Sequence, residues 1–222
     1  MSAAVWDCRF LQVSRRGRGP NLIRFAAMSE SIVVHSPAVR CQVFTFKEGL
    51  LSGMAHDLKL VVERCSIEWT AAPPLGAGES PGGGVAQVRA SFDPRSLRVV
   101  CAQRDGRDQP AALSAAQCAE IERNIQHEVL RTDRFAEVRF VSTQVKQRTN
   151  GLEIVGELTL CGQRRTLTAQ VVKQAERWAC EVRIHQPDFG IKPYSAALGT
   201  LRVKPELLVT VSMPLTELPS LT

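Results

Sequence analysis

The fold class is decided by the stretch Glu153-Ile-Val-Gly-Glu-Leu-Thr-Leu-Cys-Gly-Gln-Arg-Arg-Thr-Leu-Thr-Ala-Gln-Val-Val-Lys173. Apolar or small residues occupy every second position on both sides of a short turn at Gly162-Gln163. Strict alternation is typical of a strand with one buried face, and a turn this short can only reverse the chain. The stretch therefore predicts a β-hairpin with one apolar face and one solvated face.

Similar alternation recurs along most of the chain, which predicts further strands within residues 33–46, 50–62, 65–69, 85–92, 97–101, 137–147, 178–185 and 198–213. One helix interrupts this pattern. Ser114 and Gln117 form a capping box, and Cys118, Ile121, Ile125 and Val129 follow at helical spacing. The predicted fold is all-β with one inserted helix, in an antiparallel barrel of about eight strands, because closure removes exposed sheet edges.

The composition excludes several functional classes. The chain has 222 residues, 44% of them hydrophobic, which suits one well-buried β domain. No apolar run approaches the roughly 18 residues of a membrane-spanning helix. The net charge is +6, but residues 1–27 hold five arginines against Asp7 and so carry +4 of it. A nearly neutral body argues against nucleic-acid binding, which needs basic residues clustered on one folded surface.

The two ends of the chain are expected to lie outside the barrel domain. Residues 1–28 are predicted to be a disordered basic extension, residues 29–216 the barrel and residues 217–222 a short tail. Two alternatives remain for the extension: a translation start at Met28, or an organelle transit peptide, since the segment is rich in arginine and poor in acids. It lacks the apolar core of a secretory signal.

The cysteines and glycines do not predict a metal or cofactor site. Seven cysteines are scattered along the chain without a Cys-x-x-Cys pair, which argues against a disulfide framework or a zinc site and favours a reducing, cytoplasmic location. Residues 71–84 are rich in glycine and proline but lack the Lys-Ser/Thr of a phosphate-binding loop, so a plain loop is expected. No cofactor and no metal are expected.

Three segments together carry a resemblance to a known family: Val129 to Thr143, Gly156 to Arg165, and the loop Asp188-Phe-Gly-Ile191. In this order they resemble the YceI-like family over roughly Val33 to Met213. The resemblance implies a lipocalin-like antiparallel barrel that binds a long isoprenoid chain in its interior, without catalysis.

The resemblance and the alternation together indicate which residues form the ligand site. The predicted lining consists of Phe44, Phe46, Leu58, Leu60, Phe92, Phe135, Phe140, Leu158, Val182, Phe189 and Ile191. Small residues between the bulky ones are expected to leave space, namely Ala86, Ala90, Gly156 and Ala169. The predicted contacts to a head group at the pocket mouth are His56, Asp57, Lys192 and Tyr194.

The leading hypothesis is a non-catalytic carrier or store for a polyisoprenoid or similar amphiphile, such as a prenyl quinone or a prenyl phosphate. The alternative is an enzyme that acts on a hydrophobic substrate with His56 or His185 as base. His56 and Asp57 are neighbours in a strand and point to opposite faces, so they do not suit a catalytic pair. The expected partner is a long-chain isoprenoid or other amphiphilic lipid, with no nucleic acid, and a homodimer is left open.

Overall fold

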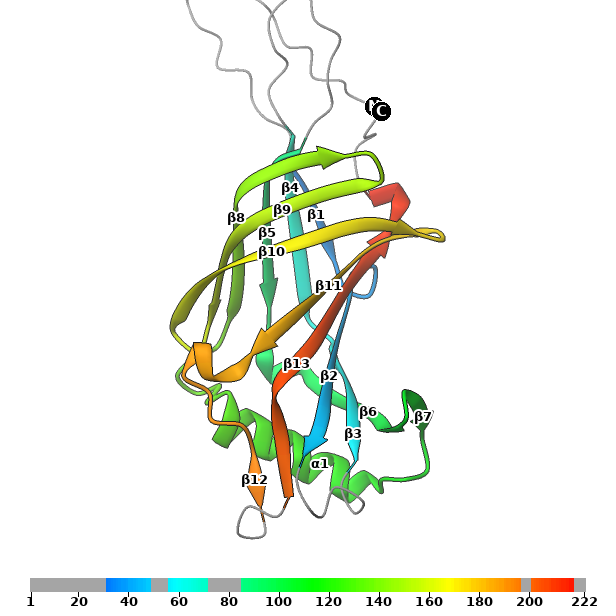
Figure 1. The fold of residues 1–222 in the computed structure, drawn as a ribbon, viewed down its shortest axis with the longest axis vertical. Coiled ribbons are helices and arrows are strands. Elements are labelled where there is room, and N and C mark those ends of the chain that lie inside the picture. Colours follow the sequence, from blue (N-terminus) through cyan, green and yellow to red (C-terminus); the bar gives the residue numbers. More distant parts are fainter. Residues whose placement is uncertain (1–30, 49–55, 72–84, 197–200, 218–222) are drawn as a thin grey trace, which may run out of the picture.

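The computed structural model describes residues 31–48, 56–71, 85–196 and 201–217. These residues form one antiparallel sheet that curls around a core, with a single α-helix across its lower end in the view of Figure 1. The expected class, all-β with one inserted helix, is confirmed in this form. The predicted N-terminal extension, the C-terminal tail after Glu217 and most of the glycine-rich loop lie outside the described residues.

The described sheet has thirteen strands, against the expected barrel of about eight. The strands are β1 (Ser31–His35), β2 (Arg40–Glu48), β3 (Asp57–Val62), β4 (Cys65–Ala71), β5 (Val85–Phe92), β6 (Leu97–Arg104), β7 (Arg107–Gln109), β8 (Val138–Arg148), β9 (Gly151–Leu160), β10 (Gln163–Gln174), β11 (Arg177–His185), β12 (Ser195–Ala196) and β13 (Leu201–Pro214). Their order is β1-β4-β5-β8-β9-β10-β11-β13-β2-β3-β6-β7, and β12 pairs with β13. Within the described residues this path is a half-barrel with β1 and β7 at its ends. The count exceeds the expected one because the structure adds the short strands β1, β7 and β12.

The β9–β10 hairpin is present as predicted from its alternation. Leu160 pairs with Gln163, so the turn consists of Cys161 and Gly162, one residue earlier than expected. Both turn residues have positive φ, 48° and 74°, which is the type I′ geometry that matches the twist of paired strands. Ile154 and Ala169 are register partners and are both buried, so the two strands share their inner face.

The predicted helix begins at the predicted cap. Helix α1 (Ala115–Asn124) follows Ser114, whose hydroxyl accepts from the backbone N–H of Gln117, while the Gln117 side chain accepts from the backbone N–H of Ser114. A π-helical turn, Ile125–Val129, continues it. Among the described residues no helix is long and apolar enough to cross a membrane.

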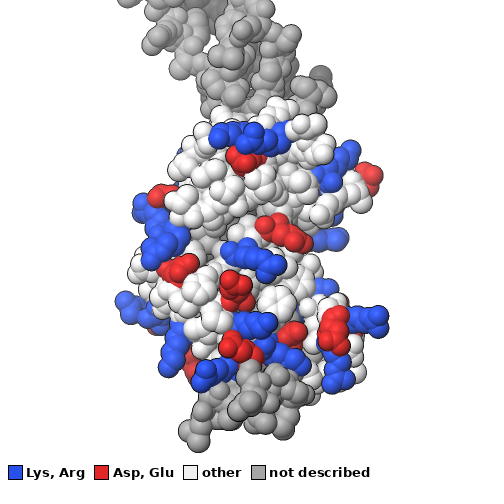
Figure 2. Space-filling model, in the orientation of Figure 1, with Lys and Arg blue, Asp and Glu red and all other residues white. Residues whose placement is uncertain are grey.

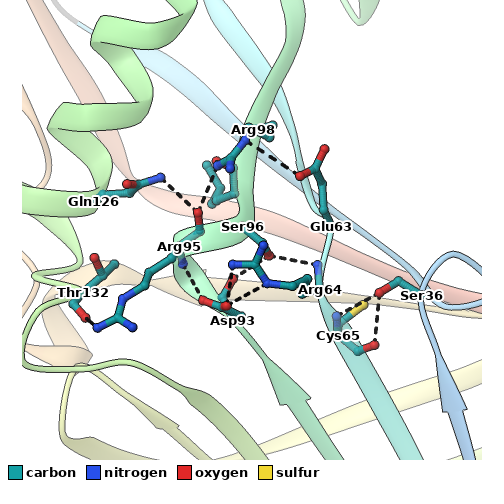
Figure 3. Close-up of polar contacts among 11 residues, drawn as sticks. Ser36, Glu63, Arg64, Cys65, Asp93, Arg95, Ser96, Arg98, Gln126 and Thr132 are labelled. Atoms are coloured by element: carbon teal, nitrogen blue, oxygen red, sulfur yellow. Dashed lines mark hydrogen bonds and ion pairs between the residues drawn. The ribbon is translucent and has the colours of Figure 1, made fainter.

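A polar network fixes the helix against the sheet (Figure 3). The carboxylate of Glu122 accepts from the backbone N–H of Val99 at 2.8 Å, which ties α1 to β6. Gln126 donates to the backbone carbonyl of Arg95, and the Arg95 guanidinium donates to the carbonyl of Thr132 at 2.9 Å. The 3-10 turn Pro94–Ser96 therefore holds both ends of the segment that follows α1.

The same network joins that 3-10 turn to the turn between β3 and β4. The hydroxyl of Ser96, which is fully buried, accepts from the backbone N–H of Arg64 at 2.9 Å and donates to the carbonyl of Asp93. Burial alone would raise the pKa of Asp93, but hydrogen bonds from the Arg64 side chain and the backbone N–H of Arg95 hold it below its usual value. Each buried polar group here has a partner.

Candidate functional site: an apolar cavity inside the sheet

A cavity of about 530 Å³ lies inside the curled sheet. Its wall is built from the inward faces of strands on all sides of the sheet and from α1, which covers one end. Alternation places every second residue of a strand on this wall, as Trp178, Cys180, Val182 and Ile184 of β11 show. The volume is within the usual range for small-molecule sites.

Most polar groups of the cavity lie at one end, which we call the polar end and define by Lys47, His56, Asn124, Tyr194 and Arg202. Strand pairing brings them together, because Val203 pairs with Lys47 and the backbone N–H of Val203 bonds to the carbonyl of Tyr194 at 3.1 Å. The amide of Asn124 donates to the Tyr194 hydroxyl at 3.4 Å, so the C-terminus of α1 borders the same opening. This is the end that carries α1 and β12 in Figure 1.

The rest of the wall is mainly apolar, with Thr45, Glu120, Gln186 and Ser212 as its polar residues, and it includes two thiols. Cys41 and Cys180 face the cavity on either side of Val211, with which both pair. Burial raises the pKa of Cys41, and the neighbouring thiols Cys65 and Cys180 add to the shift. Burial also raises the pKa of Cys180 to about 11. Both thiols are therefore protonated at neutral pH and act as small apolar groups.

Seven of the predicted lining residues face the cavity: Leu58, Leu60, Phe92, Phe140, Leu158, Val182 and Ile191. They come from β3, β5, β8, β9 and β11 and from the loop after β11. That each of them contacts a ligand stays a prediction.

Four predicted lining residues lie elsewhere. Phe44 and Phe46 are on the outer face of β2, because Cys41, Val43 and Thr45 of the same strand face inward. Both faces of β2 carry apolar residues. The prediction placed the face with the larger side chains, those of Phe44 and Phe46, inside the barrel, and this was wrong. Phe189 is buried in the core beside the cavity wall. Phe135 packs on Gly162, and its ring centroid lies 5.2 Å from the Cζ of Arg131 and 5.4 Å from the Cζ of Arg134.

Of the four small residues that were expected to leave space in the cavity, two do so and two do not. Ala90 and Ala169 line the cavity and leave space there. Gly156 leaves none, because the ring of Phe140 fills the position that a side chain would take, 2.5 Å from an added Cβ. Ala86 is exposed, since the register between β4 and β5 shifts next to it at Thr70 and Ala71. A bulge of this kind turns the following side chains to the other face.

Two of the four predicted mouth residues, His56 and Tyr194, line the polar end. Asp57 does not, because its carboxylate accepts from the backbone N–H of Lys47 at 2.7 Å. Lys192 is exposed and outside the cavity wall. His185, the other candidate base, pairs with Asp188 at 3.0 Å on the exposed outer surface, away from the cavity.

Several wall residues were missed by sequence reasoning. Trp178 and Cys180 are in register with Val182, so the alternation of β11 could have found them. Lys47 and Arg202 gave no such signal, because charged residues at strand ends are usually solvated. Trp69 follows the alternation of β4, but nothing in the sequence shows that it faces a cavity.

Charges of both signs are mixed on the face of the molecule that Figure 2 shows. In the face shown in Figure 2, lysine and arginine side chains are interspersed with aspartate and glutamate, without a broad field of one sign. Several of the arginines are paired, for instance Arg148 with Glu153 at 2.9 Å and Arg64 with Asp93 at 2.7 Å. Within the described ranges no group of three or more His, Cys, Asp or Glu residues could hold a metal ion.

Comparisons with solved structures found several similar proteins. The crystal structure of BcnA from Burkholderia cenocepacia matches with a TM-score of 0.50 and 12% sequence identity, over 79% of this chain and 94% of that one, which shows the shared fold. A polyisoprenoid binding domain from Saccharophagus degradans, implicated in plant cell wall breakdown, matches with a TM-score of 0.48 and 10% identity over 82% and 95%. A Campylobacter jejuni YCEI protein matches with a TM-score of 0.34 and 11% identity over 49% and 60%.

A search of curated protein sequences gave no match. The sequence profile of the YceI-like domain matches residues 76–215, which include every strand from β5 to β13 and helix α1. The chain therefore belongs to the family of YceI-like domains.

Proposed function

We propose that this protein binds a polyisoprenoid or a similar amphiphile in its cavity and carries or stores it without changing it chemically. The observation that carries the proposal is the distribution of polarity along the cavity wall. Most of the wall is apolar, and its charged side chains and most of its polar ones lie at or beside the end bordered by Lys47, Tyr194 and Arg202. An amphiphile with one slender apolar tail and one polar group has the same distribution.

The size of the cavity sets the size of the tail. A heavy atom takes about the liquid volume of a water molecule, ~30 Å³, so 530 Å³ holds about 18 heavy atoms, between three and four isoprene units. At about 0.3 kcal/mol per heavy atom, each five-carbon unit contributes about 1.5 kcal/mol. A solvated ion pair at the polar end adds about 1 kcal/mol or less. The tail therefore sets the affinity, and the head group sets the orientation.

The surroundings of the two candidate bases support a passive role. His56 borders the cavity, but the neighbouring carboxylate of Asp57 is bonded to the backbone of Lys47 and does not orient the imidazole. His185 has a carboxylate partner in Asp188, but that pair is on the outer surface. A general base must reach the bound substrate, and neither arrangement combines reach with orientation.

The cysteines support a reducing compartment, which we propose to be the cytoplasm. Six cysteines of the described residues are free, and four of them are buried. Thiols persist in this state where glutathione and thioredoxin keep them reduced. Fractionation of cells that express the full chain, followed by immunoblotting, tests this part of the proposal.

Native mass spectrometry of freshly purified protein tests the binding itself. We expect a complex whose additional mass is released on collisional activation and corresponds to an apolar molecule. Protein that purifies empty and takes up none of farnesol, geranylgeraniol or farnesyl phosphate on incubation would contradict the proposal.

The passive role needs a separate measurement. Each bound probe is extracted after prolonged incubation and compared with the starting material by chromatography. We expect unchanged probe with the wild-type protein and with His56→Ala. Turnover by the wild-type protein that disappears in His56→Ala would favour the enzyme alternative instead.

A further inference from the structure

Trp178 lies at the inner end of the cavity, by which we mean the end away from α1 and the polar end. The inward positions of β11 are Ile184, Val182, Cys180 and Trp178, and all of them line the cavity. Trp178 is the last of these before the turn that joins β10 to β11. In Figure 1 this turn lies in the upper part of the molecule, well above α1.

At Trp178 the inner face of the sheet changes from apolar to polar. Ala169 and Val171 of β10 line the cavity, whereas the next inward position, Lys173, is exposed and outside the cavity wall. Lys173 is the register partner of Trp178, so their side chains share a face. On its other side Trp178 pairs with Met213, which is 2% exposed and lines the cavity. Trp178 therefore stands at the boundary between the buried interior and solvent.

A second pocket lies on the outer side of this boundary. Its wall is formed by residues 147–151 around the turn between β8 and β9, by Val172 and Lys173, and by Trp178. Among the described residues, Trp178 is the one that lines both this pocket and the cavity. Its inward-facing, half-buried side chain is thus the partition between the two spaces.

We propose that Trp178 closes the inner end of the cavity and so restricts its ligands to prenyl chains of about three to four isoprene units. This inference rests on the proposed function and narrows its ligand class. A chain whose polar group stays at the polar end meets the indole ring after about 18 heavy atoms. Surplus units of a longer chain stay in water at the polar end, where they bury no apolar surface and add no affinity.

The test compares prenols of increasing length in the wild-type protein, in Trp178→Ala and in Lys173→Ala. Trp178→Ala removes about nine heavy atoms from the partition, which gives room for nearly two further isoprene units. Lys173→Ala is the matched control, because Lys173 pairs with Trp178 but lies outside the cavity wall. Dissociation constants are measured by quenching of the fluorescence of Trp69, which all three proteins retain, and thermal unfolding confirms that each variant is folded.

In the wild-type protein and in Lys173→Ala, we expect equal dissociation constants for geranylgeraniol and for geranylfarnesol, the prenol with one more unit. In Trp178→Ala, geranylfarnesol should bind about tenfold more tightly than geranylgeraniol, because the additional unit is now buried. Equal dissociation constants in Trp178→Ala, or the same gain in Lys173→Ala, would overturn the inference while the proposed function stands. Failure of every prenol to bind the wild-type protein would overturn the proposed function as well.

A second readout uses the wild-type protein alone, so it does not depend on the folding of a variant. Two farnesol derivatives carry a photoreactive diazirine, one at the end of the tail and the other beside the hydroxyl, and peptide mass spectrometry identifies the labelled residues. We expect the tail-end probe to label Trp178 or Met213, and the head-end probe to label the polar end. A tail-end label elsewhere on the wall would show that the chain does not reach Trp178, and would overturn the inference.

Discussion

The affinity of the cavity for prenyl alcohols should rise with chain length and then stop rising. Room for about 18 heavy atoms and about 0.3 kcal/mol per atom give roughly 1.5 kcal/mol for each isoprene unit that fits. The dissociation constant should therefore fall about tenfold from geraniol to farnesol. It should fall less from farnesol to geranylgeraniol, whose last unit only partly fits, and remain level for longer prenols.

A matched pair of variants tests whether the volume of the cavity sets the chain length at which the affinity stops rising. Ala90 lines the wall, so Ala90→Phe replaces a methyl group by a benzyl group and removes room for about one isoprene unit. The limit should then be reached one unit earlier, at the length of farnesol or below. Ala86 lies on the same strand with its side chain exposed, so Ala86→Phe should keep the wild-type length dependence.

The assay is quenching of tryptophan fluorescence, since Trp69 and Trp178 both face the cavity. Prenols are supplied from cyclodextrin to keep the longer ones below their solubility limit, and thermal unfolding confirms that both variants fold. An affinity that keeps rising at the same slope beyond geranylgeraniol would refute the volume argument. The same length dependence in the two variants would show that the tail binds somewhere else.

Three further predictions concern stability, measured as the free energy of unfolding in urea. Ser96→Ala should lower it by about 1–3 kcal/mol, because the backbone N–H of Arg64 loses its acceptor and the carbonyl of Asp93 loses its donor; an unchanged value would mean that water replaces the hydroxyl. Gly156→Ala should lower it by about 1–3 kcal/mol, because the new Cβ meets both the ring of Phe140 and the backbone oxygen of Val141 at 2.5 Å; an unchanged value would refute this, since movement of the ring alone does not relieve the backbone contact. Above pH 9 the unfolded chain ionises its thiols before the folded state ionises Cys180, so this one thiol should lower the stability by up to about 3 kcal/mol by pH 11, and the total fall should be smaller by that amount in Cys180→Ala; equal slopes in the two proteins would refute this.

Local patterns predicted the elements well. The hairpin around Gly162 and the helix cap at Ser114 are both present, because each depends on residues close together in the sequence. The hairpin turn was misplaced by one residue, since Cys161 takes a positive φ that non-glycine residues seldom adopt. The number of strands was underestimated, because the short strands β1, β7 and β12 carry too few residues for a periodic signal.

The faces of the strands were harder to predict than the strands. In β2 both faces carry apolar residues, and the inward face holds the smaller ones, Cys41 and Val43, while Phe44 faces out. Size and hydropathy therefore do not decide which face is inside. The register shift beside Ala71 that exposes Ala86 depends on two strands separated in sequence, so no local rule reveals it.

The residues that line the cavity were predicted only in part, because side-chain direction and strand pairing depend on parts of the chain that are distant in sequence. His56 and Tyr194 were expected at the mouth, and both line the polar end, whereas the carboxylate of Asp57 accepts from the backbone of Lys47; that His56 and Tyr194 contact a head group stays a prediction. Lys47 and Arg202 meet at the polar end only because β2 and β13 pair, which requires the sheet order.

The thiols of the cavity wall have a consequence for the chemical durability of the protein. Electrophiles and peroxides attack thiolates, and raised pKa values leave Cys41 and Cys180 with almost no thiolate at neutral pH. Unsaturated hydrocarbons form such reactive species when they autoxidise. A cavity lined by protonated thiols would therefore resist covalent modification by an oxidised ligand.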